Sequence, residues 1–178
     1  REIVHLLPDG SFKLNLKYFR HHKEGVEYEW ENGQPSVGLL FSHELESLLG
    51  PARNKEDMLE QHHKDIAHSV QAMYEEAFFH LLNSLYSRHK VNSIGIAGGC
   101  GMNSVANGKV RLRTPFQQVY VQSAAGDAGG AIGAALDVWH RLGGRASKTK
   151  GPVHDHAYWG PSYSDGTVKE MLGSKTDQ

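Results

Sequence analysis

Two stretches of the chain decide the fold: residues 94–103 read IGIAGGCGMN, and residues 119–136 read VYVQSAAGDAGGAIGAAL. Each begins with a short apolar run that is typical of a buried strand, and each then reaches glycines that favour a tight turn. The second stretch opens a proline-free segment of small residues, 128–142, which ends at Gly143 and Gly144 as helices often do. The two stretches therefore predict two strands, each leading through a glycine turn toward a helix.

The longest periodic segment lies before these turns, at residues 62–89. Apolar residues recur there at steps of three and four positions, which predicts a long amphipathic helix packed on a core. The expected apolar stripe consists of Ile66, Val70, Met73, Ala77, Leu81 and Leu85, widened by Phe78 and Leu82.

The flanking regions carry weaker signals. Residues 3–7 and 12–19 surround a Pro-Asp-Gly turn and predict a β-hairpin. We interpret residues 21–35 as a loop and residues 36–49 as containing a short helix. Beyond Gly144, residues 145–151 have the composition of a linker.

The remaining residues up to Gln178 are polar, with a weak helix expected at 165–172. The aromatic segment 158–163 could stack a ligand, although a docking contact with another domain is the preferred interpretation. The ordered domain is therefore expected to end near Gly144.

Composition narrows the function classes. The 178 residues suit one domain, and 19 Lys and Arg nearly balance 20 Asp and Glu, so no charged field argues for nucleic acid. Cys100 is the single cysteine, and we find neither a run of membrane-spanning length nor a signal peptide, so we expect a cytoplasmic protein without a membrane partner. Because the chain opens at Arg1 in a strand-like stretch, we expect it to be cut from a longer protein.

The first glycine turn could hold a phosphate or a nucleotide. Gly98 and Gly99 lack Cβ atoms, which lets backbone N–H groups approach a ligand before the expected helix at Asn103. The alternative is an ordinary tight turn, and a short glycine motif alone does not decide between them. Neither turn has the phosphate-loop ending Gly-Lys-Ser/Thr or the Rossmann spacing.

The second turn places Asp127 among Gly126, Gly129 and Gly130 at a helix start. Asp127 could be an ordinary N-cap, or it could bind a divalent cation that screens it from a polyphosphate. Because both turns follow the carboxyl ends of buried strands, where open α/β sheets place their ligands, together they predict a pocket.

Other candidates are weaker. The twelve histidines include no pair four positions apart, so a helical HxxxH metal pair is absent, and we interpret them as solvated or satisfied side chains. Cys100 has no histidine nearby in sequence, and we interpret it as a small buried structural thiol.

At these turns the sequence resembles the amino-terminal domain of the carbamoyltransferase family, which includes nodulation and antibiotic-tailoring enzymes and is related to actin-like tRNA-modifying proteins. The resemblance covers most of the chain, in the family's order and spacing. The matching segments are LLPDGSFKLNLKYF, LLGPAR, HHKDIAHSVQAMYEEA, IGIAGGCGMNSVANGKV, VYVQSAAGDAGGAIGAAL and AYWGPSYSD.

The resemblance implies an α/β fold, an actin-like ATPase (ribonuclease H-like) lobe with a mixed sheet and packed helices. Residues 1–144 would be part of that domain, its second lobe, and residues 145–178 would be a linker and the start of a carboxyl-terminal domain. The family's carboxyl-terminal domain makes carbamoyl-adenylate from carbamoyl phosphate and ATP. The actin-like domain then transfers the carbamoyl group to the hydroxyl of a small acceptor.

The resemblance also implies site residues. The family's adenylate-binding pattern falls on Gly98, Gly99 and Asn103, and its iron-binding aspartate falls on Asp127. The surrounding GDAGG motif adds Gly126, Gly129 and Gly130 to the expected cofactor site. Asp65, Ser69 and Gln71 match a further family pattern, with a solvated helix face as the alternative.

The chain departs from the family pattern at Cys100 and Gly101, where a small apolar pair is usual. The family's HxxxH metal pair and its carboxyl-terminal domain are missing from this sequence, so we expect the isolated chain to be inactive. No catalytic residue is assigned, and the acceptor and the oligomeric state are not specified. The alternatives are a sugar or acid kinase of the same superfold and a non-catalytic nucleotide-binding module.

Overall fold

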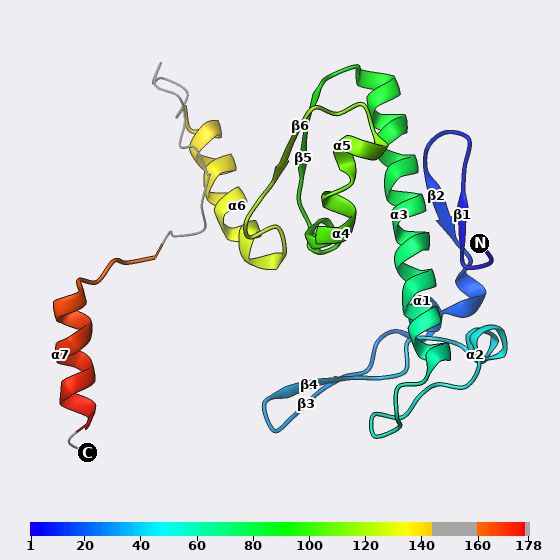
Figure 1. The fold of residues 1–178 in the computed structure, drawn as a ribbon, viewed down its shortest axis with the longest axis horizontal. Coiled ribbons are helices and arrows are strands. Elements are labelled where there is room, and N and C mark those ends of the chain that lie inside the picture. Colours follow the sequence, from blue (N-terminus) through cyan, green and yellow to red (C-terminus); the bar gives the residue numbers. More distant parts are fainter. Residues whose placement is uncertain (144–159, 177–178) are drawn as a thin grey trace. The chain divides into compact units, whose positions relative to one another are not determined.

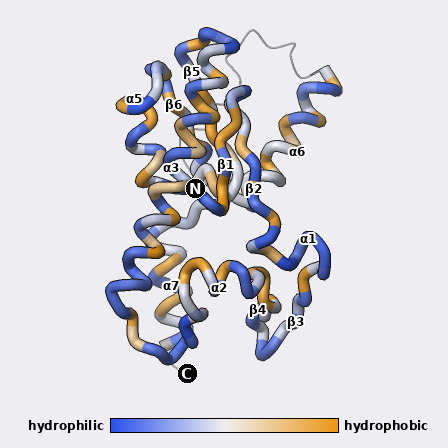
Figure 2. Tube along the Cα trace, turned by 90° about the vertical axis from the view of Figure 1, so that its right-hand side faces the viewer, coloured by the Kyte–Doolittle hydropathy of each residue, from blue (hydrophilic) through white to orange (hydrophobic). Residues whose placement is uncertain are grey.

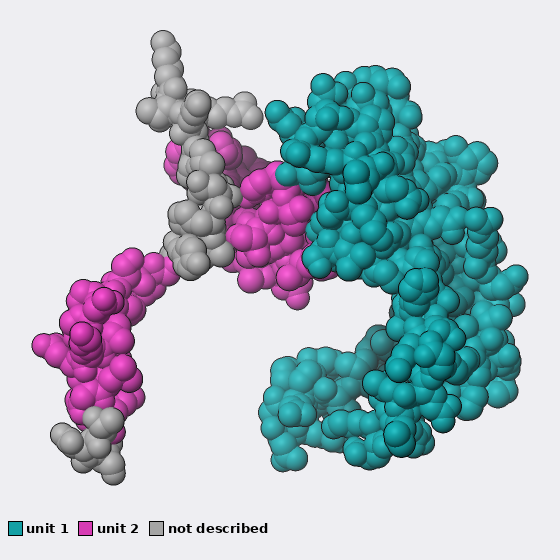
Figure 3. All heavy atoms as spheres, in the orientation of Figure 1, with its two compact units in different colours: residues 1–94, 103–119 teal, residues 95–102, 120–178 magenta. Residues whose placement is uncertain are grey.

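The computed structural model describes residues 1–143 and 160–176 (Figure 1). The chain divides into two compact units, which Figure 3 colours separately: Arg1–Ile94 with Asn103–Val119, and Gly95–Met102 with Tyr120–Gln178. The expected linker at 145–151 lies outside the described residues, as does the first part of the aromatic segment 158–163.

The predicted amino-terminal hairpin is confirmed. β1 (Val4–Leu6) pairs antiparallel with β2 (Phe12–Leu14), and Val4 lies opposite Leu14. The second strand is shorter than expected, because the 3-10 helix η1 (Leu16–Tyr18) begins after Asn15, whose side chain accepts a hydrogen bond from Lys17 N at 3.4 Å. In Figure 2, β1 is hydrophobic and α1 (His21–Glu24) is hydrophilic.

A second hairpin occupies the region interpreted as a loop, and that interpretation is wrong. β3 (Tyr28–Glu31) pairs antiparallel with β4 (Gln34–Val37), and the turn residues Asn32 and Gly33 have φ of 51° and 78°. Two consecutive left-handed residues match the right-handed twist of hairpin strands, which is why Asn-Gly turns favour hairpins. The short helix expected next is α2 (His43–Leu49).

The long amphipathic helix is confirmed as α3 (Gln61–His89), but its most buried face differs from the predicted stripe. Leu81 and Leu85 remain exposed, at 44% and 39%, whereas Phe79 and Leu82 are buried. The reason is tertiary: α3 packs against the segment that contains α5 (Val110–Arg113), where Tyr86 and Phe116 meet edge to face at 5.4 Å between ring centroids. The core of this unit includes Phe79, Leu82, Ala106, Val110 and Phe116.

The two predicted strands beside the glycine turns are β5 (Ser93–Ile96) and β6 (Gln118–Val121), which pair with each other. Gln118 N donates to Asn92 O at 3.0 Å, and Gln122 N donates to Ile96 O at 3.4 Å. The pairing therefore advances along both strands in the same direction and is parallel.

The described strands form three separate two-stranded sheets instead of the one mixed sheet expected. The two antiparallel pairs are hairpins, in which each strand pairs with its neighbour in the sequence across a short turn. Among the described strands, β5 pairs only with β6. The structure is thus a mixture of helices and small sheets, and the actin-like lobe stays a prediction.

The remaining elements follow the glycine turns. The first turn leads into η2 (Gly99–Met102) and α4 (Ser104–Asn107). The second leads into α6 (Asp127–Arg141), which confirms the predicted helix, and Gly143 just after it has a left-handed φ of 95°. α7 (Asp165–Thr176) contains the expected weak helix. Within residues 1–143 and 160–176, no helix is both long and apolar enough to cross a bilayer.

Candidate functional site

The two glycine turns contact each other directly. Gly98 N donates a hydrogen bond to Ala125 O at 2.6 Å, just beyond the carboxyl ends of β5 and β6. Gly98 adopts a φ of 98°, a left-handed conformation that glycine tolerates far better than other residues. The structure thus brings the predicted turns together at one end of a parallel strand pair.

The glycines of these turns serve two different purposes. A Cβ atom on Gly129 would lie 2.1 Å from Ala124 O, so Gly129 is needed for close packing of α6 on the turn before it. A Cβ atom on Gly126 would lie 3.2 Å from Met102 Sδ, which is also tight. At Gly99 and Gly130, by contrast, a Cβ atom would meet nothing within 4 Å. Packing therefore does not explain the last two glycines, and their open backbone suits a closely approaching ligand.

Asp127 is the first helical residue of α6, and Gly126 holds the N-cap position, so the N-cap interpretation of Asp127 is wrong. A carboxylate in the first turn is still favourable, because the helix dipole is positive there. Asp127 is exposed, and within the described part of the chain its carboxylate has no hydrogen-bond or ion-pair partner. Its position leaves the carboxylate available to a cation.

The donor set for a metal is small. Among residues 1–143 and 160–176, no group of three or more His, Cys, Asp or Glu side chains could hold a metal ion. A divalent cation in a protein takes several ligands, about six for Mg²⁺ or Ca²⁺, and Asp127 alone supplies one carboxylate. The described residues therefore do not form a metal site by themselves.

Asn103 lies at the centre of a polar network in the first unit. Its Nδ2 donates to Gln71 Oε1 at 2.8 Å, and its Oδ1 accepts from Gln71 Nε2 at 3.2 Å. The same Oδ1 accepts from Ala106 N at 3.0 Å and so caps α4. Gln71 is thus the one member of the Asp65, Ser69 and Gln71 group that contacts Asn103.

Glu75 and Lys109 extend this network. Gln71 Nε2 donates to Glu75 Oε1 at 3.0 Å, and Lys109 Nζ donates to both carboxylate oxygens of Glu75 at 2.7 Å. The hydrogen bonds from Gln71 and Lys109 lower the pKa of the Glu75 carboxyl below its ordinary value of 4.5. Neither Glu75 nor Lys109 was predicted as a site residue from the sequence. The four-residue spacing of Gln71 and Glu75 on one helix was a usable signal, whereas Lys109 depends on tertiary contact.

Asp65 and Ser69 lie one helical turn apart in α3. Ser69 Oγ donates to Asp65 O at 2.7 Å, and Gln61 Nε2 donates to Asp65 Oδ1 at 2.8 Å. Both residues line a cavity of about 350 Å³ whose apolar wall includes Val70 and Met73. They form a polar edge on an apolar groove and do not join the Asn103 network.

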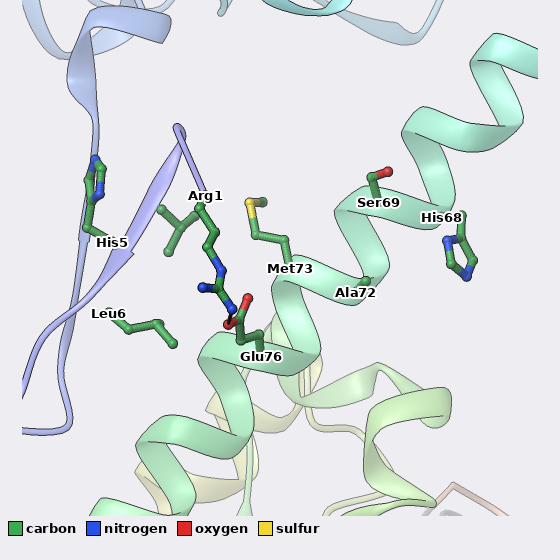
Figure 4. A pocket seen from close by; sticks show the side chains of 9 residues that line it. Arg1, His5, Leu6, His68, Ser69, Ala72, Met73 and Glu76 are labelled. Carbon is green, nitrogen blue, oxygen red and sulfur yellow. Dashed lines mark hydrogen bonds and ion pairs between the residues drawn. The ribbon is translucent and has the colours of Figure 1, made fainter.

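A cavity of about 480 Å³ lies between β1 and α3 (Figure 4). Met73 and Glu76 project from α3 toward the hairpin, and Arg1 pairs with Glu76 at 2.8 Å. Ser69 lines this cavity, but Asn103, Asp127 and the glycines of the two turns do not. Its size suits a small molecule, but its chemistry is distinct from that of the glycine turns.

Several histidines have structural roles, which agrees with their interpretation as satisfied side chains. His62 Nε2 lies 2.6 Å from Leu49 O, and His80 Nε2 lies 2.8 Å from Leu7 O. His63 Nδ1 accepts from Glu60 N at 3.1 Å, at the start of α3. Cys100 is exposed, so its interpretation as a buried thiol is wrong; the turn at Gly99–Met102 places it on the surface.

Comparison with known families places residues 1–136 in one family, described as the carbamoyltransferase N-terminus. The matched range contains both glycine turns, Asp127 and the whole polar network around Asn103. It includes every residue that the sequence predicts to contact a ligand.

Individual relatives agree with this match. An uncharacterized protein of Synechocystis is 34% identical over 96% of this chain and 26% of its own length. The nodulation protein NolNO of Sinorhizobium fredii is 37% identical over 63% of the chain and 16% of its own length. The nodulation protein NolO of Bradyrhizobium diazoefficiens is 34% identical over 69% of the chain and 23% of its own length. The chain thus spans about a quarter or less of the length of these relatives.

Proposed function

This chain belongs to the family of carbamoyltransferase amino-terminal domains, and from that premise we propose that its parent protein is an ATP-dependent O-carbamoyltransferase. In this proposal the carbamoyl group passes from carbamoyl-adenylate to the hydroxyl of a small acceptor. The family match over residues 1–136 carries the proposal. The contact between the two glycine turns supports a nucleotide site within that range.

The proposed nucleotide contacts in the second unit are the two glycine turns, and the family pattern adds Asn103 of the first unit. The open space at Gly99 and Gly130 would let the adenylate phosphate approach the backbone of the two turns closely, and Gly98 shapes the first turn. Gly129 would act mainly through packing, because a Cβ atom there would collide with Ala124 O, and Gly126 lies in tight contact with Met102 Sδ. Asn103 would donate a hydrogen bond to an oxygen of the nucleotide.

Asp127 would supply one carboxylate to a divalent ion, with iron as the expected metal, and the other ligands would come from parts of the parent outside this chain. A bound divalent ion supplies positive charge that offsets the negative charge of the phosphate. The free carboxylate at the start of α6 supports this role for Asp127.

The proposed transfer has a simple balance. The acceptor oxygen forms a bond to the carbamoyl carbon and loses its proton, while the bond from that carbon to the phosphate oxygen breaks and AMP leaves. Negative charge then grows on the departing phosphate, so N–H donors aimed at that phosphate favour the reaction. No residue is assigned to the proton transfer, and the isolated chain is expected to be inactive.

Pyrophosphate exchange in the intact parent tests the first step. Hydrolysis of carbamoyl phosphate gives carbamate and orthophosphate, and attack of the carbamate on ATP gives carbamoyl-adenylate and pyrophosphate. Reversal of the second reaction incorporates labelled pyrophosphate into ATP. The proposal predicts exchange that requires carbamoyl phosphate and persists in Asn103→Ala, because the adenylate forms in the carboxyl-terminal domain. Asn103→Ala should instead lower the release of AMP that depends on the acceptor. Exchange that is absent under all conditions, or that proceeds equally without carbamoyl phosphate, would contradict it.

A further inference from the structure

Four side chains of the first unit form a continuous series of contacts that ends at Asn103. Lys109 contacts Glu75, Glu75 contacts Gln71, and Gln71 contacts Asn103, with distances between 2.7 and 3.2 Å. Glu75 is 9% exposed, so its charge is largely removed from water and depends on Lys109 for compensation. The pair is only half-buried, because the Lys109 side chain is 41% exposed.

The series dictates which way each amide points. The Glu75 carboxylate only accepts hydrogen bonds, so Gln71 must present its NH₂ group to it. The Ala106 N–H only donates, so Asn103 must present its Oδ1 to it. With both amides oriented in this way, each of the two hydrogen bonds between Gln71 and Asn103 joins a donor to an acceptor.

Counting donors and acceptors then shows what Asn103 has left for a ligand. Its Oδ1 accepts from Gln71 and from Ala106, which uses both lone pairs. One of its two N–H donors is used by Gln71. The remaining capacity is one N–H donor, so Asn103 suits a ligand atom that accepts, such as a phosphate or ribose oxygen.

We infer that Glu75 and Lys109 are positioning residues for nucleotide binding, which act through Gln71 to hold the Asn103 amide with its remaining N–H available to the ligand. The inference rests on the proposed function, because it assumes that Asn103 contacts the nucleotide. Without the Glu75 carboxylate, the Gln71 amide keeps its two hydrogen bonds to Asn103 but loses the one that holds it from the other side, so the Gln71–Asn103 pair is fixed less firmly.

AMP affinity of the intact parent, measured by calorimetry, tests the inference. Glu75→Gln keeps the size of the side chain and removes its charge, and we expect affinity to fall about ten-fold, as for the loss of one charge-assisted hydrogen bond. Glu76→Gln is the matched control, because Glu76 is the next residue on α3 and pairs with Arg1 instead. Its AMP affinity should stay within about two-fold of the wild-type value, well below the expected loss.

Lys109 provides a second variant in case Glu75→Gln does not fold. The Lys109 side chain is 41% exposed, and Lys109→Met should weaken AMP binding while Lys109→Arg restores much of it. A role through Asn103 also predicts that Glu75→Gln adds no further loss in the Asn103→Ala background.

The outcomes separate the inference from the proposed function. If Asn103→Ala binds AMP like the wild type, the nucleotide role of Asn103 is wrong, and the inference falls with it. If Asn103→Ala weakens binding but Glu75→Gln and Lys109→Met do not, the positioning inference alone is overturned. The inference would also be overturned if Glu75→Gln lowered AMP affinity by the same factor in the wild-type and the Asn103→Ala backgrounds.

Discussion

Gln71 and Asn103 hold each other's side-chain amides through hydrogen bonds of 2.8 and 3.2 Å, although 32 positions separate them in the sequence. The pair ties the middle of α3 to the residue that follows the first glycine turn. Because Asn103 also caps α4, its side chain links a helix start to the predicted nucleotide site. The same amide thus caps α4 and is the proposed nucleotide contact.

Alanine at Gly129 and at Gly130 should have opposite effects on α6. A Cβ atom at Gly129 collides with Ala124 O, so Gly129→Ala should destabilise the turn by about 1–3 kcal/mol. Gly130 has open space and lies within the helix, so Gly130→Ala should stabilise α6 by about 0.5–1 kcal/mol. Amide hydrogen exchange across Asp127–Arg141 measures both effects.

The same two variants separate folding from binding. If a nucleotide approaches the open backbone, Gly130→Ala should weaken AMP binding even though its helix is more stable. Equal exchange rates in the two variants would show that the contact between Ala124 and Gly129 does not restrict the turn.

The stability contributed by Glu75 should depend on pH. The folded-state pKa of Glu75 is lowered, so its stabilising effect is present above the ordinary value of 4.5 and is lost as pH falls through the folded-state pKa. The stability difference between wild type and Glu75→Gln should therefore be largest near neutral pH and shrink in acid. Urea unfolding from pH 7 to pH 3 measures it, and a difference that grows in acid would refute the lowered pKa.

Asp127 should make nucleotide binding dependent on a divalent ion. In the intact parent, we expect Fe²⁺ or Mn²⁺ to strengthen AMP binding, and Asp127→Ala to remove that enhancement. Asp137→Ala is a matched control, because Asp137 lies in the same helix and pairs with Arg141 at 2.9 Å. Calorimetry with and without the ion measures the effect, and an enhancement that survives in Asp127→Ala would exclude Asp127 as a ligand.

The hairpin of β3 and β4 should depend on its Asn-Gly turn. Gly33 has a φ of 78°, so Gly33→Ala should destabilise the hairpin by about 1 kcal/mol. Amide exchange of residues 28–37 should become faster, while AMP affinity stays unchanged. Unchanged exchange would mean that the turn does not limit the stability of this hairpin.

Long periodic segments and glycine turns made part of the fold predictable from sequence. α3 and α6 follow from their composition and helix signals, and β1 and β2 follow from the Pro-Asp-Gly turn. The hairpin at Asn32 and Gly33 was missed although its turn signal was present, because β3 carries Glu29 and Glu31 and β4 contains Pro35. The residues of the two strands do not alternate clearly between apolar and polar, so the Asn-Gly turn was the one clear signal of this hairpin.

The rest depends on tertiary contacts. A helical period shows that α3 is amphipathic, but the partner segment around Val110 and Phe116 decides that Phe79 and Leu82 are buried most deeply. Likewise, the sequence predicts glycine turns without telling packing glycines such as Gly129 from open ones such as Gly130.

The identity of the nucleotide product in the intact parent tests the central claim most directly. With α-labelled ATP and carbamoyl phosphate, adenylate formation followed by carbamoyl transfer or hydrolysis yields AMP, whereas a kinase of the same superfold yields ADP. We predict AMP that requires carbamoyl phosphate and falls strongly in Asn103→Ala. Formation of ADP, or of no product that depends on carbamoyl phosphate, would contradict the assignment of this chain to an ATP-dependent carbamoyl transfer.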